Sequence, residues 1–155
     1  MRTILFVCTG NQYRSPIAAE AFRARLVQDG RDREWTVNSA GTWTAPGQPP
    51  PHDALDLARS QGVTIDGHTT RLLTADMLAE SDLVLVMEAG HKESITVEFP
   101  FARGKVHLLS QIVDGLAYDI PDPARARGEA REIIAELVAM ICAGYGKICR
   151  TAEAG

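Results

Sequence analysis

Residues 3–26, TILFVCTGNQYRSPIAAEAFRARL, join an apolar run to a polar loop and an amphipathic segment, and this order indicates the architecture of the chain. Residues 3–8 are continuously apolar and rich in strand formers, which is typical of a strand buried on both faces of a parallel sheet. The polar loop 9–15 leads into Pro16, a residue that favours the first turn of a helix. Apolar side chains then recur at helical spacing as far as Leu26. The stretch therefore predicts a strand, a tight loop and a helix.

The rest of the chain continues this alternation of strands and helices. Strands are predicted at residues 35–40, 83–87 and 106–109, and helices near residues 54–62, near 74–78 and through 133–145. Residues 45–51 are a proline-rich surface loop, and the segment before the last strand is polar. Such alternation predicts an α/β domain with a mostly parallel sheet, helices on both faces, and ligands at the carboxyl ends of the strands.

Length and composition set the broad class of the protein. At 155 residues, with no linker or internal repeat, residues 1–155 are expected to form a single domain. The hydrophobic content of 45% argues against disorder, and the net charge of −4 argues against a general nucleic-acid binder. No apolar run approaches the about 18–20 residues that span a bilayer, and the run at residues 4–7 is too short for a signal peptide. A cytoplasmic protein without membrane or nucleic-acid partners is expected.

The cysteines and histidines predict neither a disulfide framework nor a metal site. The chain has three cysteines at scattered positions, Cys8, Cys142 and Cys149, and free thiols are expected. Cys142 is expected to be a core thiol on the apolar stripe of the last helix. Cys149 would lie about 10 Å further along that helix, too far for a disulfide. No metal or other cofactor is predicted, because ligand spacing is absent from His52, His91 and His107.

The loop after the first strand carries groups suited to phosphate chemistry. Successive backbone N–H groups that enter a helix N-terminus form an anion-binding nest. Gly10 permits close backbone approach, and Asn11 tolerates the left-handed conformation. Arg14 adds a planar fork for bidentate phosphate contact, and Ser15 can donate a hydrogen bond to the sulfur of Cys8. A thiolate beside an oxyanion cradle can attack phosphorus as a nucleophile.

The position of this cysteine matters more than its presence. A lone cysteine at a strand end is more often a small buried hydrophobic residue, and the spacing Cys-x5-Arg-Ser arises by chance in many chains. Here the spacing lies directly between a buried opening strand and a helix. That context favours the functional interpretation of Cys8.

Several segments together resemble the low-molecular-weight protein tyrosine phosphatases over nearly the whole chain. The loop FVCTGNQYRSP at residues 6–16 is similar to the phosphate loop of that family. Further similar segments, in family order, are NSAGT at 38–42, GHTTR at 67–71, SDLVLVM at 81–87, and Asp122-Pro123. The resemblance implies a three-layer fold with a four-stranded parallel sheet. It also implies removal of phosphate from phosphotyrosine in proteins through a phosphocysteine intermediate.

The same resemblance implies a role for each matching residue. Cys8 would be the nucleophile, Arg14 the clamp on the phosphoryl group and Asp122 the general acid and base. The phosphate would be bound by Thr9, Gly10, Asn11, Gln12, Tyr13, Arg14 and Ser15. The residues expected to hold the loop in shape are Asn11, Ser15, Ser39 and His68.

An acid is also expected on chemical grounds, because an alkoxide or phenoxide leaving group needs a proton as its bond to phosphorus breaks. Asp114, Asp119 and Asp122 all precede the final helix. Asp122 is favoured since Pro123 stiffens its loop and the acid of the family also precedes a proline. Asp114 and Asp119 are interpreted as turn or capping carboxylates.

Three departures from the family bear on the substrate. Tyr13 stands where the family usually has a second cysteine. Gln12 replaces a residue that is usually apolar in tyrosine-directed members and threonine in the related protein-arginine phosphatases. Ala124 and the arginine after it stand where the family often has tyrosines that line the cleft. Tyr13 or Trp43 is therefore expected to supply the missing aromatic wall.

Alternative functions remain at this point. The same chemistry could act on phosphoarginine or on a small-molecule phosphate. A thioredoxin-coupled arsenate reductase shares this loop, but it needs two further relay cysteines, which the middle of this chain lacks. A non-catalytic phosphopeptide-binding module would be expected to have lost Cys8 or Asp122. The expected partners are a phosphorylated protein and phosphate or other oxyanions, and the chain is expected to act as a monomer.

Overall fold

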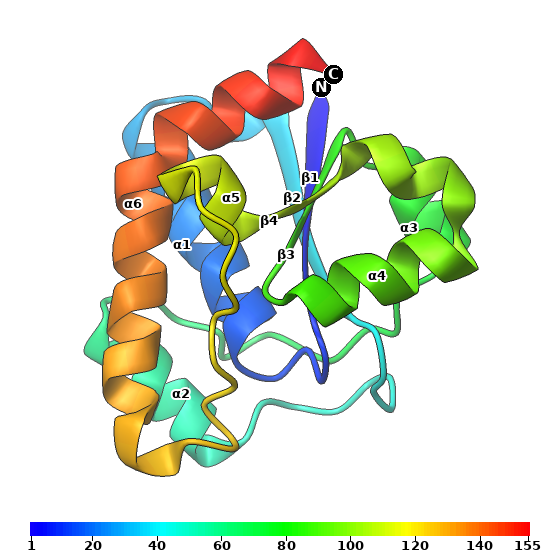
Figure 1. Ribbon diagram of the computed structural model, residues 1–155. Helices are drawn as coiled ribbons and strands as arrows, with labels where there is room; N and C mark the ends of the chain where they lie inside the picture. The colour runs from blue at the N-terminus through cyan, green and yellow to red at the C-terminus, as the bar shows by residue number, and fades with distance from the viewer.

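The centre of the molecule is one parallel sheet of four strands in the order β2-β1-β3-β4, seen in a computed structural model that describes residues 1–155 (Figure 1). The register pairs Cys8 with Gly41 and Val7 with Val86, so the carboxyl ends of the three longest strands meet at one edge. This arrangement confirms the predicted fold class. The strands are β1 Arg2–Cys8, β2 Trp35–Gly41, β3 Leu83–Val86 and β4 Val106–Leu108.

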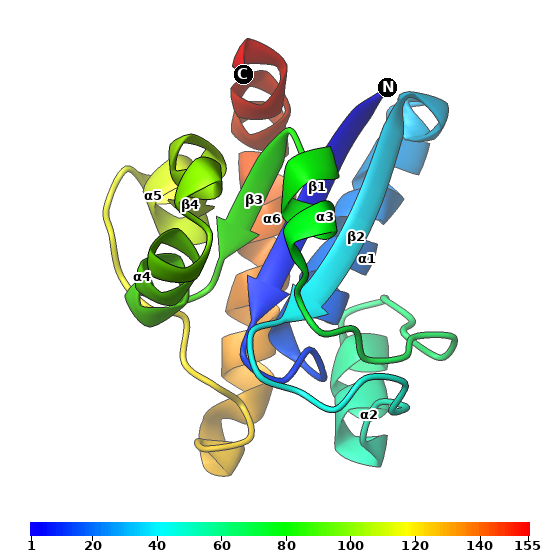
Figure 2. The same ribbon diagram turned by 90° about the vertical axis from the view of Figure 1, so that its right-hand side faces the viewer.

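Helices cover both faces of the sheet. Helices α1 and α6 lie on one face, and α3 and α4 lie on the other (Figures 1 and 2). No helix is both long enough and apolar enough to cross a membrane. The helices are α1 Arg14–Gln28, α2 His52–Ser60, α3 Ala75–Glu80, α4 Ala89–Glu98, α5 Leu109–Asp114 and α6 Ala130–Ala154, with short 3₁₀ helices η1 Asp32–Glu34, η2 Pro100–Lys105 and η3 Arg127–Glu129.

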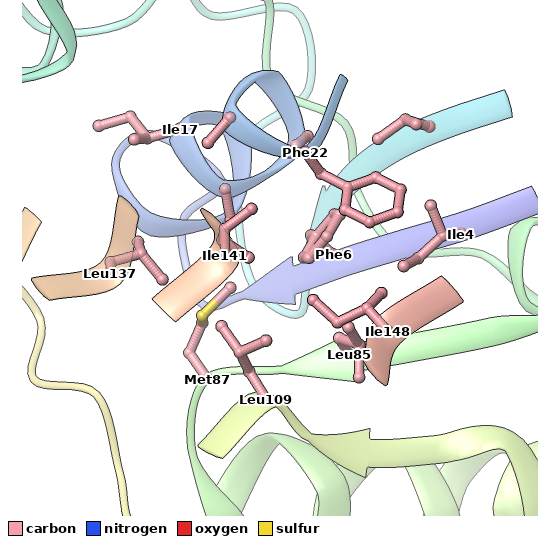
Figure 3. Close-up of a cluster of buried hydrophobic side chains, with 14 of the residues drawn as sticks. Ile4, Phe6, Ile17, Phe22, Leu85, Met87, Leu109, Leu137, Ile141 and Ile148 are labelled. Carbon is pink, nitrogen blue, oxygen red and sulfur yellow. The ribbon is translucent and has the colours of Figure 1, made fainter. Parts of the chain in front are cut away.

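The continuous apolar runs of β1 and β3 are explained by two separate cores. Successive strand side chains point to opposite faces, so each strand contributes alternate residues to each core. Figure 3 shows Ile4 and Phe6 of β1 directed toward Phe22 of α1 and toward α6. The neighbouring side chains Leu5 and Val7 pack on the other face against a smaller cluster beneath α3 and α4. Burial on both faces fixes the end of β1, and hence the loop that follows it.

Two helices were not predicted from the sequence. The segment before β4 contains α4, which buries only His91 and Ile95, so its sequence shows little apolar periodicity. Leu109 was expected at the end of the last strand, but it begins the short helix α5. Helix α5 packs closely on α6, where a Cβ on Gly144 would lie 2.5 Å from a methyl group of Val113. Tertiary packing, not local pattern, defines both helices.

The expectation that Cys142 is a core thiol is wrong. Cys142 is exposed on α6, whereas Cys149 is buried. The buried stripe of α6 passes through Ile141 and Tyr145, and Cys142 follows Ile141 by about 100° around the helix. All three cysteines are free.

Candidate active site

The loop between β1 and α1 presents a row of unpaired backbone donors. The backbone N–H groups of residues 10–15 donate to no acceptor within the protein. Asn11 has a φ of 57°, a left-handed conformation that turns the chain sharply toward the helix. The loop therefore brings its own donors together with the positive end of the α1 dipole. Such an arrangement suits a tetrahedral oxyanion.

Ser15 is placed to stabilise a thiolate on Cys8. Its Oγ lies 3.0 Å from the Cys8 Sγ. The same hydroxyl accepts a hydrogen bond from Asn11 Nδ2 at 2.8 Å, so its own proton remains available for donation. The alternative acceptor, the carbonyl of Ala40, is 3.5 Å away, at the limit of a hydrogen bond. The hydroxyl proton is therefore best directed at the sulfur.

Asn11 holds the loop in shape through each of its polar groups. Its Nδ2 also donates to Ser39 Oγ at 3.0 Å, and its Oδ1 accepts from the backbone N–H of Arg71 at 2.9 Å. Its carbonyl oxygen accepts from His68 Nε2 at 2.7 Å. The structure thus brings together the predicted loop-support residues Asn11, Ser15, Ser39 and His68. The backbone of Arg71, in one of the segments that carried the resemblance, joins the same network.

Arg14 is buried, with 2% of its side chain exposed, and it is held by one nitrogen only. Its Nη1 donates to Glu88 Oε2 at 2.5 Å and to the carbonyl of Ile120 at 2.7 Å. Its Nε and Nη2 make no hydrogen bond within the protein, although Nη2 lies 3.9 Å from Asp122 Oδ2. The edge formed by Nε and Nη2 therefore remains available to grip two oxygens of a phosphoryl group.

One small cavity of about 50 Å³ joins the three predicted catalytic side chains. Asp122 reaches this cavity from the loop that precedes α6, and its Oδ1 accepts from the Ala124 N–H at 3.0 Å. Thr9, Asn11 and Ser15 do not border it: the Thr9 hydroxyl contacts His91, and Asn11 donates to Ser15 behind Cys8. The residues that line the cavity are Cys8, Gly10, Gln12, Tyr13, Arg14, Asp122 and Ala124.

The other two candidate acids have structural partners. Asp119 Oδ1 accepts from the backbone N–H of Ala89 at 2.8 Å, and so it satisfies a free donor in the first turn of α4. Asp114 accepts a short hydrogen bond from the hydroxyl of Tyr118. Neither residue borders the cavity at Cys8. The interpretation of both as turn or capping carboxylates agrees with these contacts.

The two predicted wall aromatics are placed differently. Tyr13 borders the cavity and is 8% exposed, and its hydroxyl donates to Asp53 Oδ1 at 2.8 Å. Burial, together with this hydrogen bond, raises the pKa of Tyr13 to about 12. Trp43 is 84% exposed and lies outside the cavity, although its backbone N–H donates to the carbonyl of Thr9 at 3.1 Å. The structure thus brings the Tyr13 side chain to the cavity but not that of Trp43.

Two residues at this site, Glu88 and His91, were not predicted from the sequence. They lie at the carboxyl end of β3, and they form a reciprocal cap at the start of α4. The Glu-x-x-His spacing directly after a buried strand could have indicated them, since ligands in such folds bind at the carboxyl ends of the strands. No cluster of three or more His, Cys, Asp or Glu side chains in the structure is arranged to hold a metal ion.

Comparisons with known proteins agree on one family. The family model described as low molecular weight phosphotyrosine protein phosphatase matches residues 3–153. The low molecular weight protein-tyrosine-phosphatase Etp of Escherichia coli is 39% identical over 130 residues, which are 84% of this chain and 82% of Etp. The protein-arginine-phosphatase of Bacillus subtilis is 33% identical over 143 residues, covering 86% of this chain and 93% of that protein.

A solved structure gives the same result. Wzb of Vibrio vulnificus in complex with benzylphosphonate superposes with a TM-score of 0.76 at 31% identity, covering 98% of each chain. These matches extend over both the sheet and the loop that presents Cys8. The chain therefore belongs to the low molecular weight phosphotyrosine protein phosphatases, which are cysteine-dependent phosphatases.

Proposed function

We propose that this protein removes phosphate from phosphotyrosine in proteins, with Cys8 as nucleophile, Arg14 as clamp and Asp122 as general acid and base. The observation that carries the proposal is the shared cavity, which these three side chains border together with the loop. The unpaired N–H groups of residues 10–15 supply the oxyanion cradle. Every one of these groups comes from one chain, so the site needs no second copy, and we propose that the protein acts as a monomer.

In the first step the Cys8 thiolate attacks phosphorus and the bond to the tyrosine oxygen breaks. Charge that develops on the equatorial oxygens is met by the loop N–H groups and by Nε and Nη2 of Arg14. Asp122 gives its proton to the leaving phenolate oxygen. The products of this step are a phosphocysteine and the free tyrosine side chain.

In the second step water hydrolyses the phosphocysteine. Asp122, now a carboxylate, takes a proton from the attacking water, and the sulfur leaves as a thiolate. Ser15 Oγ, 3.0 Å from the sulfur, donates to that thiolate and stabilises it as leaving group. Inorganic phosphate then dissociates and the cycle can repeat.

Two observations support an aryl phosphate as substrate. The ring of Tyr13 and the methyl group of Ala124 give the cavity an apolar wall beside Asp122. The related Wzb of V. vulnificus was solved with benzylphosphonate, a phosphonate that carries an aromatic ring. The exposed Trp43, anchored to Thr9 through its backbone, is available to contact a protein substrate outside the cavity.

The proposal is tested with peptides of one sequence that carry either phosphotyrosine or phosphoarginine. We expect kcat/KM for the phosphotyrosine peptide to be at least about tenfold higher, and the reverse order would reassign the substrate. Cys8→Ser should abolish turnover of both peptides and leave binding of inorganic phosphate largely intact. Cys142→Ser changes an exposed thiol and should keep full activity. Turnover by Cys8→Ser near the wild-type rate would refute the proposed nucleophile.

A further inference from the structure

The turn between β3 and α4 supports the phosphate loop at two points. Glu88 Oε2 accepts from Arg14 Nη1 at 2.5 Å, and His91 Nε2 lies 2.8 Å from Thr9 Oγ1. The two supporting residues are locked to each other, because the side chain of each bonds the backbone N–H of the other. A single turn therefore contacts both the first residue after Cys8 and the arginine that grips the phosphoryl group.

The hydrogen bonds of His91 fix its tautomer. The backbone N–H of Glu88 donates to His91 Nδ1 at 3.1 Å, so Nδ1 carries no proton. The proton of the neutral ring is then on Nε2, which donates to Thr9 Oγ1. Burial and the nearby Arg14 cation lower the pKa of His91, and together they outweigh the opposing effects of the Glu88, Asp119 and Asp122 carboxylates. The hydrogen bond that Nδ1 accepts therefore depends on the neutral form, whereas Nε2 can donate to Thr9 in either form.

His91 contacts the loop through Thr9 and is linked to Arg14 only through Glu88. It does not border the cavity at Cys8, and the side chain of Thr9 faces a separate polar cavity on the other side of Asp122. The backbone of Thr9 is bonded to β1 through Cys8 and accepts from the Trp43 N–H at 3.1 Å. The hydroxyl contact with His91 is the hydrogen bond made by the side chain of this first loop residue.

We propose that His91 is a positioning residue for the phosphatase reaction. Through its contact with Thr9 it keeps the start of the phosphate loop in a fixed position relative to the Arg14 guanidinium, which Glu88 holds. This inference rests on the proposed function of Cys8 and Arg14. Without the His91–Thr9 contact the loop N–H groups and Arg14 are no longer held by one common support. Transition-state binding depends on that alignment, so the loss should appear in kcat.

Matched substitutions separate the two hydrogen bonds of His91. His91→Asn keeps an acceptor near the Nδ1 position for the Glu88 N–H but does not reach Thr9. His91→Gln places an amide donor near the Nε2 position and can retain the Thr9 contact. Thr9→Val removes the hydroxyl with little change of shape, and Thr9→Ser retains it. The assay is steady-state turnover of an aryl phosphate, with inorganic phosphate as competitive inhibitor and thermal unfolding as the check on folding.

His91→Asn and Thr9→Val should each lower kcat about tenfold and weaken phosphate inhibition, which is the size of one lost hydrogen bond. The double variant should be no slower than either single variant, and His91→Gln and Thr9→Ser, which retain the contact, should recover most of the kcat that His91→Asn and Thr9→Val lose. The inference would be overturned if the kcat losses of the two single variants added up in the double variant, or if kcat did not change. It would also be overturned if the loss of kcat matched the fraction of each variant that is unfolded. If Cys8→Ser is inactive in the same assay, any of these results refutes the role of His91 and not the proposed nucleophile.

Discussion

The hydroxyl of Tyr13 donates to Asp53 Oδ1 over 2.8 Å and so ties the phosphate loop to α2, a helix forty residues further along the chain. Tyrosine is protonated at neutral pH, and the rise of the Tyr13 pKa to about 12 keeps this hydroxyl a donor in alkaline solution as well. The ring is thereby fixed as one wall of the cavity at Cys8. A cysteine at this position would instead place a second thiol in the loop.

The first prediction follows from the absence of that second thiol. Peroxide should oxidise the Cys8 thiolate to a sulfenic acid and then to higher acids, with poor recovery of activity on adding a thiol reductant. In Tyr13→Cys, the introduced thiol should condense with the sulfenic acid, release water and form a disulfide that the reductant reverses. Recovery of activity and mass spectrometry of the peptide that contains Cys8 measure the difference.

The other cysteines should not rescue the wild type. Arg2 Nη1 contacts the carbonyl of Ala152 at 3.4 Å, so the end of α6 lies beside the start of β1, about 20 Å from Cys8. Cys149 lies one turn from Ala152, and Cys142 is exposed on α6. Full recovery of the wild type through a disulfide to Cys142 or Cys149 would contradict this placement.

The second prediction concerns the proton donor. Asp122→Ala should slow hydrolysis of phenyl phosphate about 100-fold or more, because the phenolate then leaves without a proton. With nitrophenyl phosphate, whose leaving group is stable as an anion, the loss should be much smaller. The measurement is kcat across a series of phenols of graded pKa. Asp119→Ala should show no such dependence, since Asp119 caps α4, and a larger dependence there would reassign the acid.

The third prediction concerns the close approach of β2 to the phosphate loop. A Cβ on Gly41 would lie 2.5 Å from the carbonyl oxygen of Thr9 and 3.1 Å from the Cβ of Asn11. Gly41→Ala should therefore displace the loop, lower the free energy of unfolding by about 1–3 kcal/mol and reduce kcat strongly. Gly104→Ala, where a Cβ meets nothing within 4 Å, is the matched control. Equal behaviour of the two variants in urea unfolding and in turnover would show that the loop tolerates the displacement.

The fourth prediction is a loss of stability in mild acid. Burial lowers the pKa of His91 and of His107 below the usual 6.5. As the pH falls through 6.5 the unfolded chain binds protons that the folded protein does not, so the free energy of unfolding must fall. The free energy of unfolding is therefore highest above pH 6.5. It declines as the pH falls below 6.5, until the pH reaches the lowered pKa values of the folded state.

Urea unfolding between pH 5 and pH 8 measures this dependence. His91→Asn and His107→Asn should each flatten part of the slope, and the double variant should flatten it further. Only His91→Asn should also lower kcat, because His107 lies on β4 and does not contact the loop. A slope that neither variant changes would assign the acid sensitivity to other groups.

The parallel sheet and the residues that we propose as reacting groups could be predicted from local sequence patterns alone. The continuous apolar runs at residues 3–8 and 83–87 required burial on both faces, and a parallel sheet is the arrangement that provides it. The loop 9–15 follows directly from the end of such a strand into a helix, so Cys8 and Arg14 were recognisable from local chemistry. These features depend on neighbouring residues only, which is why the pattern of the chain was sufficient.

The contacts that hold those groups in place could be seen only in the folded structure. Helix α4 was not predicted because it buries only His91 and Ile95, and its role is to present Glu88 and His91 to Arg14 and Thr9 across more than seventy residues of chain. The exposure of Trp43 and of Cys142 likewise depends on which face of a segment meets the core. Contacts between distant segments arise from the packing of helices on the whole sheet, so they cannot be predicted from the local periodicity of the sequence.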